Sequence, residues 1–391
     1  MKIGVYFGGV LSDPKSGGGY TFQYSLLQAI KRSHSTHEFV ILDSLQKKLS
    51  SPQDSLLKKA ALKCWRYFDT REVQKKYKSL LNRAVLENNI DMVWFVTPAH
   101  QFVEVPYLYT VWDLQHRHQS FFPEVSVTGS TFEERERHYA NVIPRAAYVL
   151  AGNETAKREV MRFYGMSEQR VETLELPTPD FVFDKTLEQV DVIKKYDFKR
   201  PYVFYPAQFW PHKNHITLLY AIKQLKEQGS LVDLVLTGSD KGNLAYVQEI
   251  VATLGLQDQV HFLGFVSIPE LVALYRNACA LTFASFFGPN NIPPLEAFAL
   301  GCPVIAADVD GMREQLGDAA LFFNPRSLEQ LAQHIQTLLN DYDLRQQLIN
   351  KGLARANSWT CDDYVQKIIK ILDEFAPVRR CWSSTQRYIH G

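Results

Sequence analysis

The alternation of short apolar runs with amphipathic stretches constrains the fold of this chain more than any other feature. The first half carries five apolar runs that read as strands: IGVYFGG, EFVILD, DMVWFV, YLYTVWDL and AAYVLAGN. Helical patterns such as YTFQYSLLQAIKR and ETAKREVMRFYG stand between or after them, the latter with Asn153 as its N-cap. Strands that alternate with helices are typical of a parallel-sheet α/β domain.

The same alternation starts again after a proline-rich break, LELPTPDFVF. A second series runs from PYVFYPAQ to the late helix LEQLAQHIQTLLND. Because a chain of 391 residues exceeds what a single core usually supports, we predict two domains. They cover residues 1–185 and 186–365 and face each other across a cleft, while residues 366–391 pack back on the first domain. Ligands are expected at the carboxyl ends of the strands.

Composition excludes several classes of protein. Lys and Arg number 43 against 42 Asp and Glu, so there is no global signal for nucleic acid. The five cysteines are scattered and odd in number, which fits a reducing cytosol better than a disulfide framework or a zinc site. The N-terminal apolar run is too short for a signal peptide, and no run of about 20 apolar residues predicts a spanning helix.

A lysine beside a predicted helix start is the first candidate anion site. In YPAQFWPHKNH, Lys213 falls between the end of a strand and the beginning of a helix. Free amide donors at that helix start would join the lysine in holding an anion. A solvated loop lysine is the ordinary alternative, and His212 and His215 are expected on the surface.

A glycine-rich loop after the first strand is the second candidate. Gly17, Gly18 and Gly19 in PKSGGGY permit close backbone approach to a phosphate. The full G-x-G-x-x-G order is missing, so a dinucleotide site is disfavoured. A plain flexible loop fits this motif equally well.

The stretch FFGPNNIPPLEAFALGCPVIAAD contains an isolated carboxylate, Glu296. Two prolines fit a helix start and Gly301 fits its end, which puts Glu296 in the first turn. There it would face the cleft and accept hydrogen bonds from two neighbouring hydroxyls, as in a ribose diol. A helix-start charge on the surface is the alternative. Three backbone amides could point at ligand oxygens, those of Asn290, Asn291 and Ile292.

Two further stretches, DVDG and residues 56–85, could have a function but are also explained by ordinary structural roles. Asp308 and Asp310 in DVDG resemble a D-x-D that holds a hard cation, but a turn after VIAA also favours Asp and Gly. Residues 56–85 carry nine Lys or Arg against two acids. That segment suits contact with an anionic bilayer or an ordinary solvated helix pair.

Taken in order, the motifs of the second half resemble one known family. YPAQFWPHKNH, LVLTGSDKGN, VHFLGFVSIPELVALYRNACALTFAS and GPNNIPPLEAFALGCPVIAADVDGMREQLGDAALFFNP resemble the retaining GT-B glycosyltransferases of family four, the group 1 glycosyl transferases. The resemblance is strong over residues 200–375. It is weaker in the first half, through the glycine loop, TVWDLQHRHQSFFPE and RAAYVLAGNETAKREV. Bacterial and cyanobacterial exopolysaccharide and O-antigen enzymes are the members it most resembles.

The resemblance implies a GT-B fold, in which two Rossmann-like domains face each other across a cleft. It implies a nucleotide-sugar donor on the C-terminal domain and an acceptor on the N-terminal domain. Glu296 matches the second acid of the family's Glu-x7-Glu signature, which grips the ribose, and Lys213 matches the lysine that binds the diphosphate. Other residues that match donor-binding positions are Gly17, Gly18, Gly19, Gln208, Gly238, Phe265, Asn290, Asn291 and Ile292.

Three departures from the family pattern leave the sugar open. Gly288 stands where the family has the first acid, so the side chains of Asn290 and Asn291 would have to substitute. Gln208 replaces an arginine, and Trp112-Asp113 replaces a His-Asp pair. These departures also keep a non-catalytic sugar-nucleotide-binding module open, and an epimerase of the same architecture is a further alternative.

The resulting expectation is a cytoplasmic retaining enzyme that transfers a sugar from UDP-glucose or a near relative. Lys213 and the amides near the glycine loop would stabilise the charge on the leaving diphosphate. Asp113 would orient a sugar, and the reaction would need no protein nucleophile and no metal. The acceptor would be a saccharide or a lipid-linked saccharide of the cell envelope or of an exopolysaccharide. The basic segment would bring the enzyme to the inner face of the plasma membrane.

Overall fold

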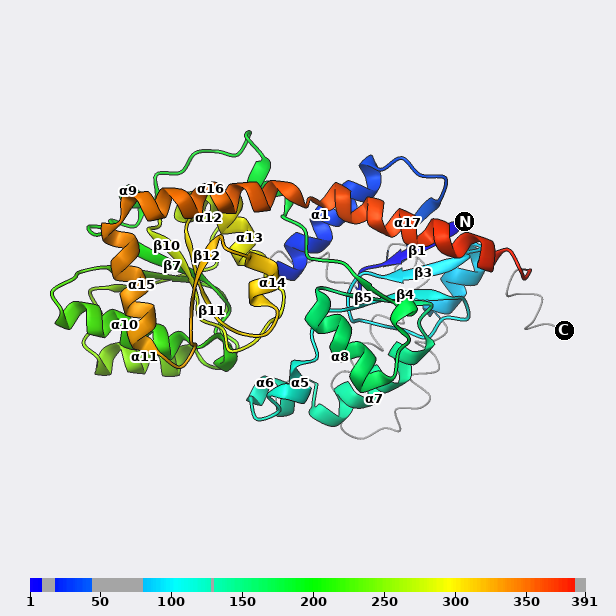
Figure 1. The fold of residues 1–391 in the computed structure, drawn as a ribbon, viewed down its shortest axis with the longest axis horizontal. Helices are drawn as coiled ribbons and strands as arrows, with labels where there is room; N and C mark the ends of the chain where they lie inside the picture. Colours follow the sequence, from blue (N-terminus) through cyan, green and yellow to red (C-terminus); the bar gives the residue numbers. More distant parts are fainter. Residues whose placement is uncertain (9–17, 44–79, 128–129, 384–391) are drawn as a thin grey trace, which may run out of the picture.

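The computed structural model describes residues 1–8, 18–43, 80–127 and 130–383. These residues form two α/β domains side by side, joined along one edge by the consecutive helices α16 (Tyr342–Ser358) and α17 (Cys361–Arg379) (Figure 1). Each domain contains one six-stranded sheet, and every strand pair within the two sheets is parallel. The expected class, two Rossmann-like α/β domains, is confirmed.

The N-terminal domain is built on the strand order β2-β1-β3-β4-β5-β6. Strands β1 to β5 coincide with the five apolar runs seen in the sequence, whereas the short edge strand β6 was not predicted. Asn153 caps α8 as expected, accepting from the amide of Ala156 at 2.8 Å. The elements of this domain are β1 (Lys2–Tyr6), α1 (Gly18–Arg32), β2 (Glu38–Ile41), β3 (Met92–Phe95), β4 (Tyr107–Val111), α5 (Gln115–His118), α6 (Pro123–Ser126), α7 (Phe132–Val142), β5 (Tyr148–Ala151), α8 (Glu154–Tyr164) and β6 (Val171–Thr173).

The C-terminal domain has the order β12-β11-β10-β7-β8-β9, so the chain reverses direction across the sheet between β7 and β10. Such a reversal opens a crevice at the carboxyl ends of the strands. The elements are α9 (Val192–Lys195), β7 (Tyr202–Pro206), η6 (Pro211–Lys213), α10 (His215–Glu227), β8 (Asp233–Thr237), α11 (Leu244–Thr253), β9 (Val260–Gly264), α12 (Ile268–Asn277), β10 (Ala280–Phe283), α13 (Ile292–Ala299), β11 (Val304–Ala307), α14 (Met312–Leu316), β12 (Ala320–Phe323) and α15 (Leu328–Asn340).

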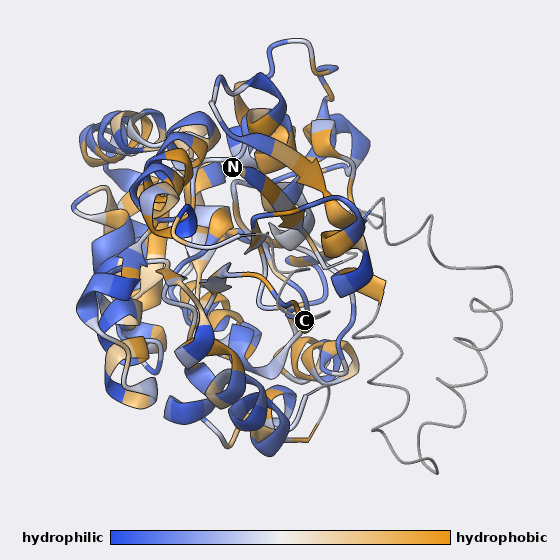
Figure 2. Ribbon diagram, turned by 90° about the vertical axis from the view of Figure 1, so that its right-hand side faces the viewer, coloured by the Kyte–Doolittle hydropathy of each residue, from blue (hydrophilic) through white to orange (hydrophobic). Residues whose placement is uncertain are grey.

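Burial explains why these apolar runs become strands. Strands β3, β4, β8, β10 and β11 are buried along their whole length, as strands covered on both faces by helices must be. The helices carry one apolar and one polar face, which gives them alternating orange and blue bands in Figure 2. The two sheets are therefore the central layers of the two domains.

The return to the N-terminal domain begins earlier than the expected boundary at residue 366. Helix α17 starts at Cys361, because Thr360 and Asp363 form a capping box that fixes its first turn. Its apolar face packs on the core of the N-terminal domain together with α1 and β3. The final helix is thus a single unit that belongs to the N-terminal domain from its first residue.

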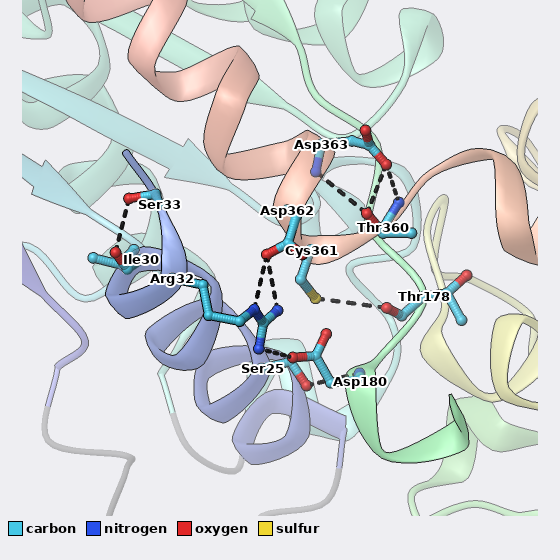
Figure 3. Close-up of polar contacts among 10 residues, drawn as sticks. All are labelled: Ser25, Ile30, Arg32, Ser33, Thr178, Asp180, Thr360, Cys361, Asp362 and Asp363. Atoms are coloured by element: carbon cyan, nitrogen blue, oxygen red, sulfur yellow. Dashed lines mark hydrogen bonds and ion pairs between the residues drawn. The ribbon is translucent and has the colours of Figure 1, made fainter. Parts of the chain in front are cut away.

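Both chain connections between the domains lie next to each other (Figure 3). Thr178 of the outgoing connection pairs with Thr360 of the returning one, and the Cys361 thiol donates to the Thr178 carbonyl at 3.5 Å. Arg32 of α1 donates to Asp180 at 2.9 Å and to Asp362 at 2.8 Å, so it ties the two connections to one helix. If the two domains rotate relative to each other, the connections near Thr178 and Thr360 are where the backbone must bend.

Within the described ranges, no helix combines the length and the apolar character that crossing a bilayer requires. Most of the basic segment, residues 56–79, lies outside the described residues, so its expected membrane contact stays a prediction.

Candidate functional site

The carboxyl ends of both sheets meet at the boundary between the domains. Gly18, the first residue of α1, lies against Ile292, the first residue of α13: a Cβ on Gly18 would be 3.4 Å from Ile292 Cδ1. A Cβ on Gly19 would be 3.6 Å from the Trp112 ring. The start of α1, with Gly18 and Gly19, and the start of the Glu296 helix are therefore neighbours in the structure. Gly17 lies outside the described residues.

Lys213 lies at the end of η6, directly before the helix α10, as the sequence predicts. Its ammonium group is 5.2 Å from the centre of the Phe283 ring at the end of β10. Burial lowers the pKa of Lys213 to about 8, while Asp113 and Glu124 of the other domain act in the opposite direction. Among the described residues the ammonium has no ion-pair partner, so a half-buried cation is available to a ligand.

Glu296 is not a surface charge, and it is not in the first turn of its helix. Helix α13 begins at Ile292, which places Glu296 in the second turn, and the side chain is 5% exposed. The Tyr275 hydroxyl donates to Glu296 Oε2 at 2.7 Å. Burial raises the pKa of Glu296 to about 7, and the bond from Tyr275 lowers it.

The two carboxylate oxygens of Glu296 differ. Tyr275 donates to Oε2, whereas Oε1 has no partner among the described residues. Oε1 is also not among the polar atoms that are both fully buried and unpaired, so solvent or a ligand can reach it. A buried carboxylate with one open oxygen needs a donor to offset its desolvation. Oε1 of Glu296 can therefore accept a hydrogen bond from a group outside the described residues.

The loop before α13 departs from expectation at Asn291. Its backbone amide donates to Gln315 Oε1 at 2.9 Å, and its side-chain amide donates to the Gly288 carbonyl at 2.5 Å. Neither group is free to bind a sugar in place of the acid that the family has at position 288. By contrast, both polar atoms of the Asn290 side chain are buried, and neither forms a hydrogen bond with another described residue.

Gly288 itself is required by the local backbone. Its φ of 118° lies in the region that residues with side chains rarely adopt, and a Cβ there would be 2.8 Å from Asn291 Oδ1. An acid at this position would therefore strain the loop as it is folded here.

The remaining donor-binding candidates also follow carboxyl ends of strands. Gln208 follows β7 and accepts from the Trp210 ring at 3.0 Å. Gly238 follows β8, and a Cβ there would be 2.3 Å from the Ala207 carbonyl, so close approach of two loops explains the glycine. Phe265 follows β9 and is 58% exposed, which leaves its ring free to stack on a base.

The two histidines near Lys213 are buried, which corrects the expectation of surface residues. His215 stacks on Phe209 with ring centres 4.7 Å apart, and in the described part of the chain neither of its ring nitrogens meets a hydrogen-bond partner. His212 stacks on Phe287 at 3.9 Å. Burial lowers the pKa of both, to about 3 for His215 and about 4 for His212, so both are neutral at pH 7.

Asp113, in the N-terminal domain, follows β4 and is half-buried, accepting from the amide of Gln115 at 3.1 Å. Its charge acts on Lys213 and on His212 across the domain boundary. The structure thus brings Asp113 and Lys213 to the same cleft.

The DVDG stretch forms a turn between β11 and α14. Both carboxylate oxygens of Asp308 accept from Arg313, at 2.8 and 2.7 Å. In the part of the chain that the structure describes, no three His, Cys, Asp or Glu residues gather into a possible metal site.

A groove of about 730 Å³ lies between the domains beside this turn. From the N-terminal domain it is lined by His118, Gln119 and Phe121, whose ring is 73% exposed. The C-terminal domain supplies Phe286, Asp308, Val309, Arg313, Phe322, Asn324, Pro325, Arg326 and Gln330. The Pro325 carbonyl accepts from Asn214, the residue after Lys213, so the groove borders the lysine loop.

Sequence reasoning missed two residues at the site, Tyr275 and Glu124. Tyr275 is 21 positions from Glu296, inside a segment that reads as an ordinary amphipathic helix. Glu124 lies in the other domain and accepts from His212. The motif TVWDLQHRHQSFFPE contains Glu124, but nothing in its pattern indicates the partner.

Comparisons with known proteins agree with this fold. The structure of sucrose-phosphate synthase from Thermosynechococcus elongatus superposes with a TM-score of 0.73, covering 97% of this chain and all of that one at 17% identity. Anabaena HepE, solved in complex with UDP-glucose, gives a TM-score of 0.68 over 96% of this chain and all of that one at 16% identity. At these identities the likeness establishes a shared fold.

Sequence comparison finds one matching family model and several relatives among curated proteins. Residues 189–355 match the sequence model of the family described as Glycosyl transferases group 1. The O-antigen chain mannosyltransferase RfbU of Salmonella typhimurium is 28% identical over 229 residues, which are 55% of this chain and 61% of that protein. O-antigen chain mannosyltransferase B of Escherichia coli is 25% identical over 237 residues, 60% of this chain and 62% of that protein. The chain thus spans about three-fifths of the length of these curated relatives.

Proposed function

We propose that this protein is a retaining glycosyltransferase that moves a hexose from a nucleoside diphosphate sugar to a saccharide. The observation that carries the proposal is the pair of groups at the carboxyl ends of the C-terminal sheet. The half-buried Lys213 cation has no ion-pair partner among the described residues, and the buried Glu296 carboxylate has one oxygen without a partner there. A diphosphate suits the first group, and a ribose diol suits the second.

The donor assignment rests on resemblance and on this chemistry. We propose UDP-glucose, because HepE shares the fold and was solved with that compound. The relatives named mannosyltransferases make mannose the competing sugar. Phe265 would stack on the base. The Asn290 side chain, whose polar atoms are buried, would have to turn toward the sugar to bind it.

In the proposed reaction, the bond between the anomeric carbon and the diphosphate breaks with negative charge on the diphosphate. Lys213 stabilises that charge, a role of the oxyanion-hole type. Asp113 orients a sugar from the opposite domain. The acceptor hydroxyl attacks from the leaving-group face, and a phosphate oxygen of the donor takes its proton. No metal and no protein nucleophile take part.

The interdomain groove beside Lys213 is the proposed route of the acceptor. Phe121 and Phe286 offer aromatic faces to sugar rings, and Gln119 and Gln330 offer amides that both donate and accept. The acceptor would be a growing envelope polysaccharide or a lipid-linked saccharide. Residues 56–85 would then hold the enzyme at the cytoplasmic face of the membrane.

A panel of nucleotide sugars tests the proposal. The protein is incubated with UDP-glucose, UDP-galactose and GDP-mannose, and the free nucleoside diphosphate is measured. Slow release without an acceptor supports a transferase, whereas an isomerised sugar would indicate an epimerase. Binding without any turnover would leave only a sugar-nucleotide-binding module.

A further inference from the structure

A contact across the domain boundary holds the loop that carries Lys213. Glu124 of α6 lies in the N-terminal domain and is buried, and its Oε1 accepts from the His212 backbone amide at 3.0 Å. The same oxygen accepts from His212 Nδ1. One carboxylate thus binds the main chain and the ring of the residue that precedes Lys213.

The protonation states make this contact strong. Although burial acts to raise it, the bonds from His212 lower the pKa of Glu124 below its usual value, so the carboxylate is ionised at neutral pH. His212 is neutral there, and an ionised carboxylate only accepts. The single ring proton therefore lies on Nδ1, where it points at Glu124. Hydrogen bonds to a charged acceptor are stronger than those between neutral groups.

Aromatic packing and one further bond surround the contact. The Phe122 ring lies 5.5 Å from Phe287 and 5.8 Å from Phe286, centre to centre. Gln119 donates to the Phe286 carbonyl at 2.9 Å. Segment 119–124 of the N-terminal domain thus closes on the lysine loop and on the loop after β10 together.

The C-terminal domain anchors the other side of the lysine loop. The Tyr205 hydroxyl donates to the Lys213 carbonyl at 2.9 Å, and the Phe286 amide donates to the His212 carbonyl at 2.8 Å. The lysine loop is therefore held from two sides, by Glu124 of the N-terminal domain and by the Tyr205 hydroxyl and the Phe286 amide of the C-terminal domain.

We propose that Glu124 and His212 form an interdomain clasp that secures the closed arrangement and positions Lys213 for the leaving diphosphate. Glu124 is a positioning residue, because it acts through His212 and its neighbour. The inference rests on the proposed role of Lys213. It adds that the leaving-group site is complete only when both domains contribute to it.

The test compares Glu124→Ala with the parent protein and with Asp373→Asn. Asp373 also bonds a buried histidine, His37, at 2.9 Å, but within the N-terminal domain and its returning helix. We expect Glu124→Ala to lower kcat for nucleotide-sugar turnover at least roughly tenfold, the size typical of losing bonds to a charged group. The dissociation constant of UDP should stay within about threefold, because UDP binds mainly to the C-terminal domain. Asp373→Asn should match the parent in both.

The variant Glu124→Gln keeps a hydrogen-bond acceptor at position 124 but removes its negative charge. Its amide oxygen still accepts from the His212 amide, so kcat at pH 7 should recover in part. The titratable groups that face Lys213 are the carboxylates of Glu124 and Asp113, which favour its charged form, and the rings of His212 and His215, which are neutral at pH 7. Removing one carboxylate should move the high-pH loss of activity to lower pH, since Lys213 then loses its proton more readily.

A measurement of domain closure that needs no turnover distinguishes a failure of the clasp from a failure of the proposed enzymatic activity. Small-angle scattering with saturating UDP should show a larger radius of gyration for Glu124→Ala than for the parent and for Asp373→Asn. If Glu124→Ala fails to fold, His212→Phe keeps the stacking on Phe287, removes the ring bond and should show the same opening. Identical scattering for the parent and the clasp variants would overturn the clasp, whether or not any nucleotide sugar is turned over.

Discussion

The replacement Glu296→Gln should make the free protein more stable and its nucleotide complex weaker. Burial raises the pKa of this carboxyl from 4.5 to about 7. The folded protein therefore holds the proton more tightly than the unfolded chain. The free energy of unfolding therefore falls as the pH rises from 4.5 to about 7, and above that range the full cost of burying the charged carboxylate applies. At 1.36 kcal/mol for each pH unit, the penalty is about 3 kcal/mol.

Glutamine carries no charge and so avoids this penalty. We expect Glu296→Gln to raise the free energy of unfolding at pH 8 by up to about 3 kcal/mol, and the gain should vanish toward pH 4.5. Glu270→Gln is the matched contrast. Its carboxylate is also buried, but bonds from Lys195 and Ser267 hold its pKa at about 2, so its loss should destabilise the protein at pH 8.

Nucleotide binding should change in the opposite sense. Losing a charge-assisted bond to a ribose hydroxyl is worth about 1.5–3 kcal/mol, which corresponds to roughly 10- to 150-fold in affinity. Ribose does not change during transfer, so KM should rise and kcat should stay nearly constant. The assay is calorimetric titration of UDP and of 2′-deoxy-UDP into both proteins at pH 6 and pH 8.

The ratio of the two affinities isolates Glu296, because both nucleotides carry the same phosphates. In the parent protein UDP should be preferred at pH 8 and the preference should shrink at pH 6, where the carboxylate takes up a proton. In Glu296→Gln the preference should be small at both pH values. A preference that is equal in both proteins would refute the ribose contact, and a destabilised Glu296→Gln at pH 8 would refute the burial argument.

Four further experiments test Lys213, the metal-free reaction, the interdomain groove and the basic segment. Lys213→Ala should lose about 2.7–4 kcal/mol of transition-state stabilisation, and the parent's activity should fall as the pH rises through about 8; activity within a few-fold of the parent would remove Lys213 from the mechanism. Donor turnover should be unchanged in excess EDTA, and strong rescue by magnesium or manganese would contradict a metal-free reaction. Phe121→Ala should raise the KM of the acceptor and leave acceptor-free hydrolysis of the donor unchanged; an unchanged KM would exclude the groove. Anionic vesicles should sediment the protein at low salt and release it at high salt, and the absence of binding at low salt would exclude the membrane contact of residues 56–85.

Local patterns were sufficient to predict the fold. Apolar runs that alternate with helical patterns indicate two parallel-sheet α/β domains, although the order of the strands within each sheet was not predicted. The position of Lys213 between β7 and α10 was predicted for the same reason. Strand ends, unlike side-chain partners, are visible in the local sequence.

Contacts between distant residues could not be predicted. The bond from Tyr275 to Glu296 and the bonds from His212 to Glu124 join residues 21 and 88 positions apart. Their existence depends on packing that no periodicity encodes. His215 is similar, because a stacked histidine without polar partners looks the same in sequence as a surface histidine. The occupied amide of Asn291 depends on Gln315, which lies beyond the next strand.

A crystal structure of the protein with UDP tests the central claim most directly. We expect the diphosphate within about 3 Å of Lys213 Nζ and a ribose hydroxyl at the same distance from Glu296 Oε1, with Phe265 beside the base. We also expect the bonds between His212 and Glu124 to persist in the complex. UDP bound elsewhere, or bound with its ribose turned away from Glu296, would contradict this claim.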